Sequence, residues 1–152
     1  MPDAPIRDTD DQARDLARKL LSDARHGALA VLIDGAPFVS RIALAPHNNS
    51  LLTLISDLAP HTAALRASPS ASLMIGEPGR GDPLAHPRMT LSVTAEFIDK
   101  AIAGGAYLAH QPKAKLYIGF GDFHLVRLTL QGAQLNGGFG KAYALSRSDL
   151  TA

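Results

Sequence analysis

The chain has 152 residues, a hydrophobic fraction of 46%, a charged fraction of 19% and a net charge of +1, which is typical of one globular domain. It contains no cysteine, so disulfides, thiolate catalysis and cysteine-ligated metal sites are excluded. The balanced charge, with no dense Lys/Arg run, argues against a nucleic-acid surface.

Residues 1–9 are polar and include two prolines, which predicts a flexible arm ahead of a single domain over residues 10–152. The start has no basic segment followed by an apolar one, so it does not match a secretory signal. No window approaches 18 uncharged apolar residues, and no membrane span is expected. A cytoplasmic protein is therefore the expectation.

A helix is predicted over residues 10–25. Thr9 and Gln12 match the capping-box pattern, and apolar residues recur at helical spacing from Ala13 to Ala24, which indicates one buried face. Gly27 is expected to follow the end of the helix.

After this helix the pattern changes to short apolar or alternating runs, which predict strands. Asp34-Gly35 is a strong hairpin signal. Two short helices are expected, over residues 58–69 and 101–111, the second broken by Gly104-Gly105. The six predicted strands cover residues 27–34, 37–44, 51–56, 70–77, 88–98 and 124–135.

Most of the connections between these strands are short, which favours antiparallel pairing over parallel units with crossover helices. Six strands leave edges that must be hidden, and a small closed or split barrel does this. We therefore expect a mainly β fold with flanking helices.

The glycine-rich stretch at residues 137–141 raises the question of a phosphate-binding loop. Leu135 stands where a Walker A loop needs its first glycine, and Tyr143 stands where a dinucleotide fingerprint needs its third. Both templates fail. A turn or bulge after a strand remains one interpretation, and an anion contact through Lys141 the other.

Three other places in the sequence, one helix start and two strands, suit an anion better than the glycine-rich stretch does. His61 and Thr62 stand near the start of the second predicted helix, where backbone N–H groups favour negative charge, although a plain helix cap is an equal alternative. Arg41 and Arg88 lie in predicted strands, and arginine binds phosphate with two hydrogen bonds. The six histidines have no metal-ligand spacing. Asp122 is expected to cap a turn or to orient His124.

Four segments in order resemble the heme-utilisation branch of the pyridoxamine 5′-phosphate oxidase superfamily of FMN-binding split barrels. The overall likeness spans about residues 24–143, and the segments are residues 56–62 (SDLAPHT), 68–73 (SPSASL), 122–128 (DFHLVRL) and 137–142 (GGFGKA). The resemblance implies a six-stranded antiparallel split barrel that pairs as a homodimer. Two FMN molecules are then expected in grooves between the subunits.

On this likeness, nine residues surround the flavin. Arg88 and Met89 are expected near the edge of the isoalloxazine, and Lys141 is expected to reach the site from the partner subunit. The strand-two residues contact the flavin or its phosphate, and the remaining three surround the phosphate and ribityl chain. The nine are Ser40, Arg41, Ile42, Ser56, His61, Thr62, Arg88, Met89 and Lys141.

The sequence departs from both groups of the superfamily. The oxidases hold their substrate phosphate with a C-terminal Arg-x-His-x-Arg pattern, which is missing here, so pyridoxal phosphate synthesis is not expected. The heme-utilisation proteins usually have a further C-terminal domain that supplies a heme ligand, and this chain is expected to lack it. Thr62 also stands where the oxidases often have a basic side chain.

These considerations predict an FMN-binding flavoprotein, an oxidoreductase acting on a small molecule that the sequence does not identify. One alternative is a heme-binding or heme-utilisation protein, for which His61 or His124 is the first candidate ligand. The other is a non-catalytic dimer that binds a small ligand.

Overall fold

The computed structural model describes residues 6–151, and the expected six strands are all present. Three further short strands, β1 (Ile6–Arg7), β4 (Ala45–His47) and β9 (Ala142–Ser146), extend the sheet. The first of these falls in the expected arm and pairs in parallel with β9, while residues 1–5 lie outside the described residues. The six long strands are β2 (His26–Ile33), β3 (Ala36–Ala43), β5 (Ser50–Ser56), β6 (Ser70–Ile75), β7 (Arg88–Ile98) and β8 (Phe123–Asn136).

The sheet is antiparallel apart from the β1–β9 pair. Its strands run in the order β1-β9-β8-β7-β6-β2-β3. Strand β8 is long enough to take two partners on one edge: its first half pairs with β5 and its second half with β9, while β7 occupies the other edge. The sheet therefore branches at β8.

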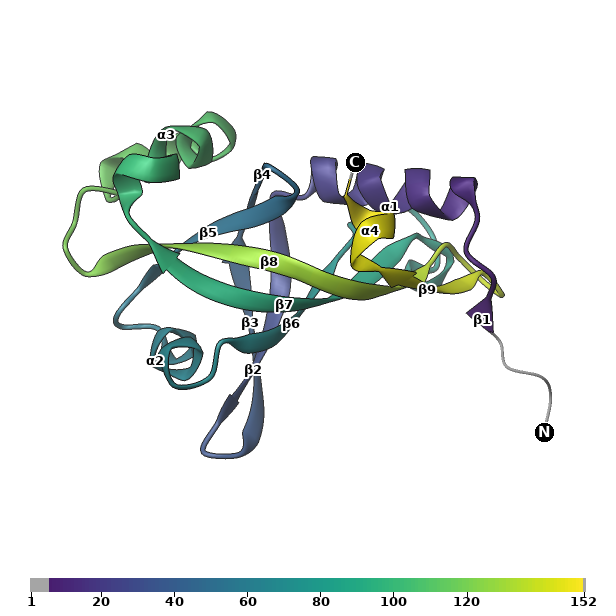
Figure 1. Ribbon diagram of the computed structural model, residues 1–152, viewed down its shortest axis with the longest axis horizontal. Coiled ribbons are helices and arrows are strands. Elements are labelled where there is room, and N and C mark those ends of the chain that lie inside the picture. Colours follow the sequence, from purple (N-terminus) through teal and green to yellow (C-terminus); the bar gives the residue numbers. More distant parts are fainter. Residues whose placement is uncertain (1–5, 152) are drawn as a thin grey trace.

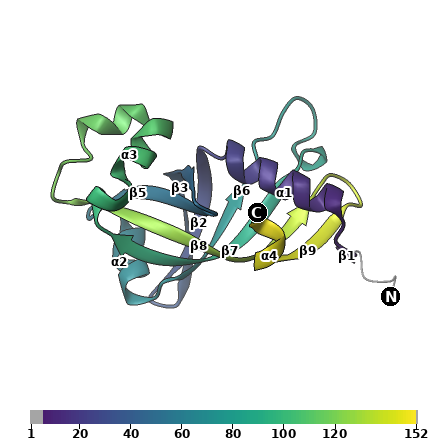
Figure 2. The ribbon, with the colours of Figure 1, turned by 45° about the horizontal axis from the view of Figure 1, so that its top comes forward.

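The sheet stays open, which confirms the split-barrel expectation. Strands β3 and β5 lie against each other, but within residues 6–151 no ladder joins them. Strands β7 and β8 run along the length of the molecule, with α2 and α3 toward one end and β9 toward the other (Figure 1). The segment between β6 and β7 stands out beside α1 (Figure 2).

The helices of the described residues differ from the prediction at their ends. The N-cap is Asp10, whose side chain accepts a hydrogen bond from the Ala13 N–H, while the Thr9 hydroxyl donates to the Ala144 carbonyl instead. The first helix also ends earlier than expected, with Ala24 as its C-cap. The helices are α1 (Asp11–Asp23), α2 (Pro60–Ala67), α3 (Lys100–His110) and α4 (Arg147–Leu150), with 3₁₀ turns η1 (Pro83–Ala85) and η2 (Pro112–Leu116).

The predicted break in the third helix at Gly104-Gly105 is wrong, because α3 is continuous. Its buried face includes Ala103, Gly104 and Tyr107. This face packs on a small apolar cluster beside β5 and β8. Packing outweighs the low helix propensity of two glycines, which is about 1 kcal/mol each.

The main core lies between the inner face of the sheet and helices α1, α2 and α4. Alternate strand residues point inward, as in β2, where Leu29 and Val31 are buried. Helix α1 contributes the face that its spacing predicted, with Ala13, Ala17 and Leu21 buried. The inner face of the strands is thus packed in the core. On the outer face of β2, β3 and β6, the exposed fractions of Leu32, Val39 and Met74 are 61, 62 and 47%.

The turn between β2 and β3 has the predicted hairpin form. Asp34 and Gly35 both have positive φ, 51° and 80°, as a two-residue type I′ turn requires. The turn fixes the register, which pairs Leu29 with Ser40 and Ala28 with Arg41.

Candidate functional site

The three predicted site residues on β3 do not point the same way. Ser40 pairs with the buried Leu29 and faces inward, as does Ile42, which is 5% exposed. Arg41 lies between them and points to the outer face, where it is exposed. A ligand can therefore meet the side chain of Arg41 or those of its two neighbours, but not all three from one side.

Inside the barrel, Ser40 meets the start of α2. Its Oγ lies 2.9 Å from Nδ1 of His61, a residue that is only 7% exposed. Burial lowers the pKa of His61, because water no longer solvates the imidazolium. The contact therefore joins β3 to α2 through a histidine that favours the neutral form.

Ser56 and Thr62 build the turn that leads into α2. The Thr62 hydroxyl donates to the Ser56 carbonyl at 2.6 Å, and the Ser56 hydroxyl accepts from the Leu58 N–H at 3.1 Å. The helix itself begins after Ala59, without a side-chain cap. The two hydroxyls thus stabilise the local turn. The helix start has few N–H groups to offer a ligand, because Pro60 has none and the Thr62 N–H donates to the Ala59 carbonyl at 3.1 Å.

Arg88 and Met89 lie at the start of β7, opposite the end of β8. The Arg88 guanidinium donates to the carbonyls of Leu84 and His86, at 3.1 and 3.3 Å. Met89 is fully buried in the main core. The Arg88 side chain is therefore hydrogen-bonded within the chain, and that of Met89 is buried in its core.

The glycine-rich stretch forms a tight loop between β8 and β9. The Gly137 N–H donates to the Lys141 carbonyl at 2.8 Å, and the Lys141 N–H donates to the Gly138 carbonyl at 3.2 Å. Gly138 and Gly140 have φ of 124° and 70°, which other residues rarely adopt. The turn interpretation thus describes its backbone, while Lys141 projects at the exposed rim.

One chain does not gather the nine predicted residues in one place. Ser40, Ser56, His61 and Thr62 cluster around the start of α2, whereas Lys141 belongs to the β8–β9 loop. These two elements lie at opposite ends of the long strands (Figure 1). Any ligand contacting both groups needs a second chain.

A groove of about 630 Å³ lies at the outer rim between the end of α1, the start of β2, Arg41 of β3, and the end of β6 with the segment that follows it. Arg41 lines it, and its guanidinium has no hydrogen-bond or ion-pair partner within residues 6–151. His26 and Glu77 line it too, with His26 Nε2 lying 2.8 Å from Glu77 Oε2. Sequence reasoning missed this pair, because only the β2–β6 pairing brings residues 51 positions apart together.

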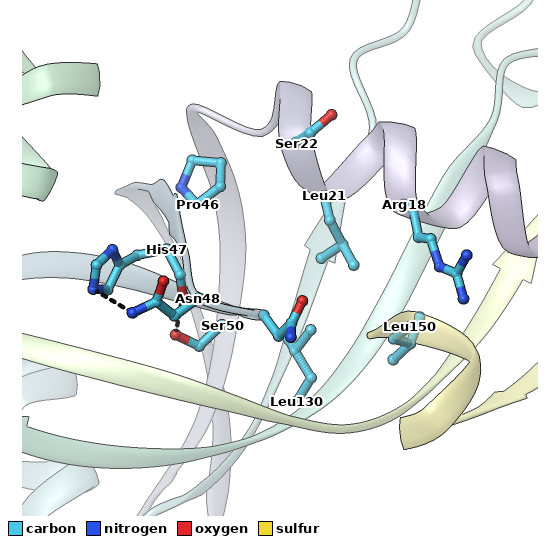
Figure 3. A pocket seen from close by; sticks show the side chains of 10 residues that line it. Arg18, Leu21, Ser22, Pro46, His47, Asn48, Ser50, Leu130 and Leu150 are labelled. Carbon is cyan, nitrogen blue, oxygen red and sulfur yellow. Dashed lines mark hydrogen bonds between the residues drawn. The ribbon is translucent and has the colours of Figure 1, made fainter. Parts of the chain in front are cut away.

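A smaller cavity of about 290 Å³ lies between α1, the β4–β5 turn and α4. Figure 3 shows Arg18 reaching from α1 toward the helix that contains Leu150. Arg18 donates from Nη2 to the Thr151 carbonyl at 3.2 Å, and its buried Nε has no partner within the described residues. None of the nine predicted residues lines this cavity.

His124 is held by an acid other than Asp122. Its Nε2 lies 2.7 Å from Asp57 Oδ1, and its ring meets Phe97 edge-on at 6.1 Å. The orienting role weighed for Asp122 therefore belongs to Asp57, which follows β5 and reaches the paired strand β8.

Two absences apply to residues 6–151. No cluster of three or more His, Cys, Asp or Glu side chains is arranged to hold a metal ion. No helix in this part of the chain has the length and apolar character needed to cross a membrane.

Comparison with known structures identifies the fold. No family model matches the sequence, and no curated protein matches it. One solved structure is 38% identical, covers 96% of this chain and 99% of its own, and has a TM-score of 0.86. A heme-binding protein from Mycobacterium smegmatis is 30% identical over 93% of this chain, with a TM-score of 0.86. The chain spans 61% of that protein.

The fold also matches more distant structures. A pyridoxamine 5′-phosphate oxidase homologue from Listeria innocua is 15% identical, covers 80% of this chain and 96% of its own, and has a TM-score of 0.63. At this identity the match supports the fold alone. Together with the closer matches and the branched, open sheet, it shows that the chain has the pyridoxamine 5′-phosphate oxidase-like split-barrel fold.

Proposed function

We propose that this protein is an FMN-binding flavoprotein and an oxidoreductase acting on a small molecule. The observation that carries the proposal is Arg41, a cation without a partner among the described residues that lines a groove of about 630 Å³. Arginine without a carboxylate partner on a groove wall is suited to a phosphate or carboxylate. The family resemblance names FMN as the ligand with such a phosphate.

The chain's own residues would bind and orient the flavin, which supplies hydride or electron transfer when bound. Arg41 would hold the phosphate from the outer face. Ser40 and His61 would hold β3 against the start of α2, on the inner side of the strand from which Arg41 projects outward. No protein acid or base is required for hydride transfer itself.

The proposed active form is a homodimer. The outer face of the sheet exposes Leu32, Val39 and Met74, more apolar surface than an isolated sheet face favours. The β8–β9 loop, which contains Lys141, and α2 lie at opposite ends of the long strands (Figure 1), so the predicted contact of Lys141 with the flavin would come from the partner subunit. Both features support a second copy packed on this face.

A second candidate function is heme binding. It is favoured by the M. smegmatis heme-binding protein, which is 30% identical over nearly the whole of this chain. Because this chain spans 61% of that protein, the remaining part of the relative is not represented in the comparison. Heme binding is therefore proposed for the groove of this chain alone.

The test is a mass spectrum of the small molecules released from the purified protein, combined with light scattering for its mass in solution. FMN in the released fraction and a mass twice that of the chain are expected. A protein that is monomeric and that binds no added FMN up to about 100 µM, well above the affinities of tight cofactor sites, overturns the first proposal. Released heme in place of FMN favours the second.

A further inference from the structure

We infer that His26 is the protein ligand to heme iron in the groove, with Glu77 orienting its ring and Arg41 binding a heme carboxylate. This inference rests on the second candidate function and assigns its residues. All three side chains line the same groove, although they come from β2, the segment after β6, and β3.

The contact between His26 and Glu77 has the form found behind metal-binding histidines. His26 Nε2 lies 2.8 Å from Glu77 Oε2. A neutral histidine that donates its Nε2 proton to a carboxylate has its lone pair on Nδ1. Such a partner fixes the tautomer and raises the basicity of the ligating nitrogen. Nδ1 has no hydrogen-bond partner among the described residues.

The groove suits a metal whose other ligands come from a cofactor and not from the protein. The described residues contain no cluster of three metal-binding side chains, so a bare divalent ion would find too few donors there. A tetrapyrrole supplies four nitrogens and needs one more ligand from the protein. His26 is about half exposed, at 51% of its side chain, and is therefore accessible to a bound ring.

The apolar walls of the groove also suit a heme, while its lining holds two cations, Arg25 and Arg41, and two acids, Asp23 and Glu77. Leu20, Met74 and Ile75 give it apolar walls, and a planar apolar ring gains free energy from such burial. Arg41 stands two residues across the β2–β3 ladder from His26, since His26 pairs with Ala43 and Ala28 with Arg41. It is free to bind a carboxylate at the ring's edge.

The two histidines favoured by the sequence are engaged elsewhere. His61 is buried and bonded to Ser40, and His124 bonds Asp57 and packs against Phe97. Neither lines the groove. Among the groove residues, His26 is the one imidazole.

The test is titration of the full chain with hemin, followed by the Soret band, alongside titration with FMN. We expect the wild type to give a histidine-ligated Soret band that His26→Ala loses. Glu77→Ala should weaken hemin binding about 10- to 100-fold, the effect of removing such a supporting partner. The FMN titration of the wild type tests the first proposal separately, because FMN has no iron for His26 to ligate.

A matched control separates ligation from nonspecific hemin adsorption. His110→Ala removes an exposed histidine at the end of α3, outside the groove, and should leave the band intact. If His26→Ala binds hemin as the wild type does, or if His110→Ala loses the band equally, the inference is overturned while heme binding stands. If the wild type binds no hemin, the second candidate function fails and the inference fails with it.

Discussion

Ser40 Oγ and His61 Nδ1 lie 2.9 Å apart inside the barrel, joining a strand at the open edge to the short helix that fills that end. No backbone ladder joins β3 to β5 in the described structure. The side-chain contact between Ser40 and His61 is therefore one of the links at the open side of the barrel. Arg41, the next residue, is thereby positioned on the outside.

Removing the hydroxyl should destabilise the fold. Ser40→Ala leaves a buried imidazole nitrogen without its partner, which costs about 1–3 kcal/mol. Urea unfolding measures this directly. Ser72→Ala, on the exposed outer face of β6, is the matched control and should stay within about 0.5 kcal/mol of wild type. Equal stability of the two variants would show that the Ser40–His61 contact does not hold the split.

The buried His61 predicts a pH dependence of folding. Its pKa is lowered in the folded protein by burial, so the unfolded chain takes up the proton first as pH falls. The stabilisation is present above the unfolded pKa of about 6.5 and is lost below it. Unfolding free energies of wild type and His61→Asn between pH 8 and pH 5 check this: the wild type should lose more. Parallel pH curves would contradict it.

Much of the fold followed from the sequence because it depends on local patterns. Short apolar or alternating runs located all six long strands, and Asp34-Gly35 located the hairpin with its type I′ geometry. The continuous α3 did not follow, because tertiary packing at Ala103 and Tyr107 decided it. The cap of α1 did not follow either, since Asp10 and Thr9 are both residue types that cap helices and the Thr9 bond to Ala144 is long-range.

Two glycine substitutions should have opposite signs. Gly35→Ala forces a side chain into φ of 80°, which costs about 1–2 kcal/mol. Gly105→Ala, within α3 and with open space around its new Cβ, should stabilise by about 0.5–1 kcal/mol. Thermal unfolding of the two variants compares them, and a loss of stability in Gly105→Ala would indicate that the helix needs its glycine.

The link between α1 and α4 should weaken in acid. Arg14 lies 2.8 Å from Asp149 and, by hydrogen bonding, lowers the pKa of Asp149 to about 2. The stabilisation is thus present above the unfolded carboxyl pKa of about 4 and is lost as pH falls toward 2. Asp149→Asn should lower the melting temperature at pH 7 and have little further effect at pH 2.5. An equal loss at both pH values would contradict the assignment.

The candidate site could be predicted only in part from the sequence. The motif at residues 56–62 predicted His61 and Thr62, which the chain brings to one turn, and the position of Arg41 within an apolar strand predicted an anion contact. Neighbouring residues of a strand point to opposite faces, so Arg41 and Ser40 lie on different sides of β3. Their spacing in the sequence predicts this separation, but the family resemblance grouped them in one site. The groove pair of His26 and Glu77 required the register of β2 against β6, and no local signal contains that information.

If the groove beside Arg41 binds the cofactor, Arg41→Ala should weaken FMN binding. Titration of the wild type and the variant with FMN, followed by fluorescence quenching, measures this. We expect saturable binding by the wild type and about 10- to 100-fold weaker binding by the variant, which loses one charge-assisted hydrogen bond. Unchanged FMN affinity in Arg41→Ala, with the variant folded as judged by its unfolding curve, would contradict it.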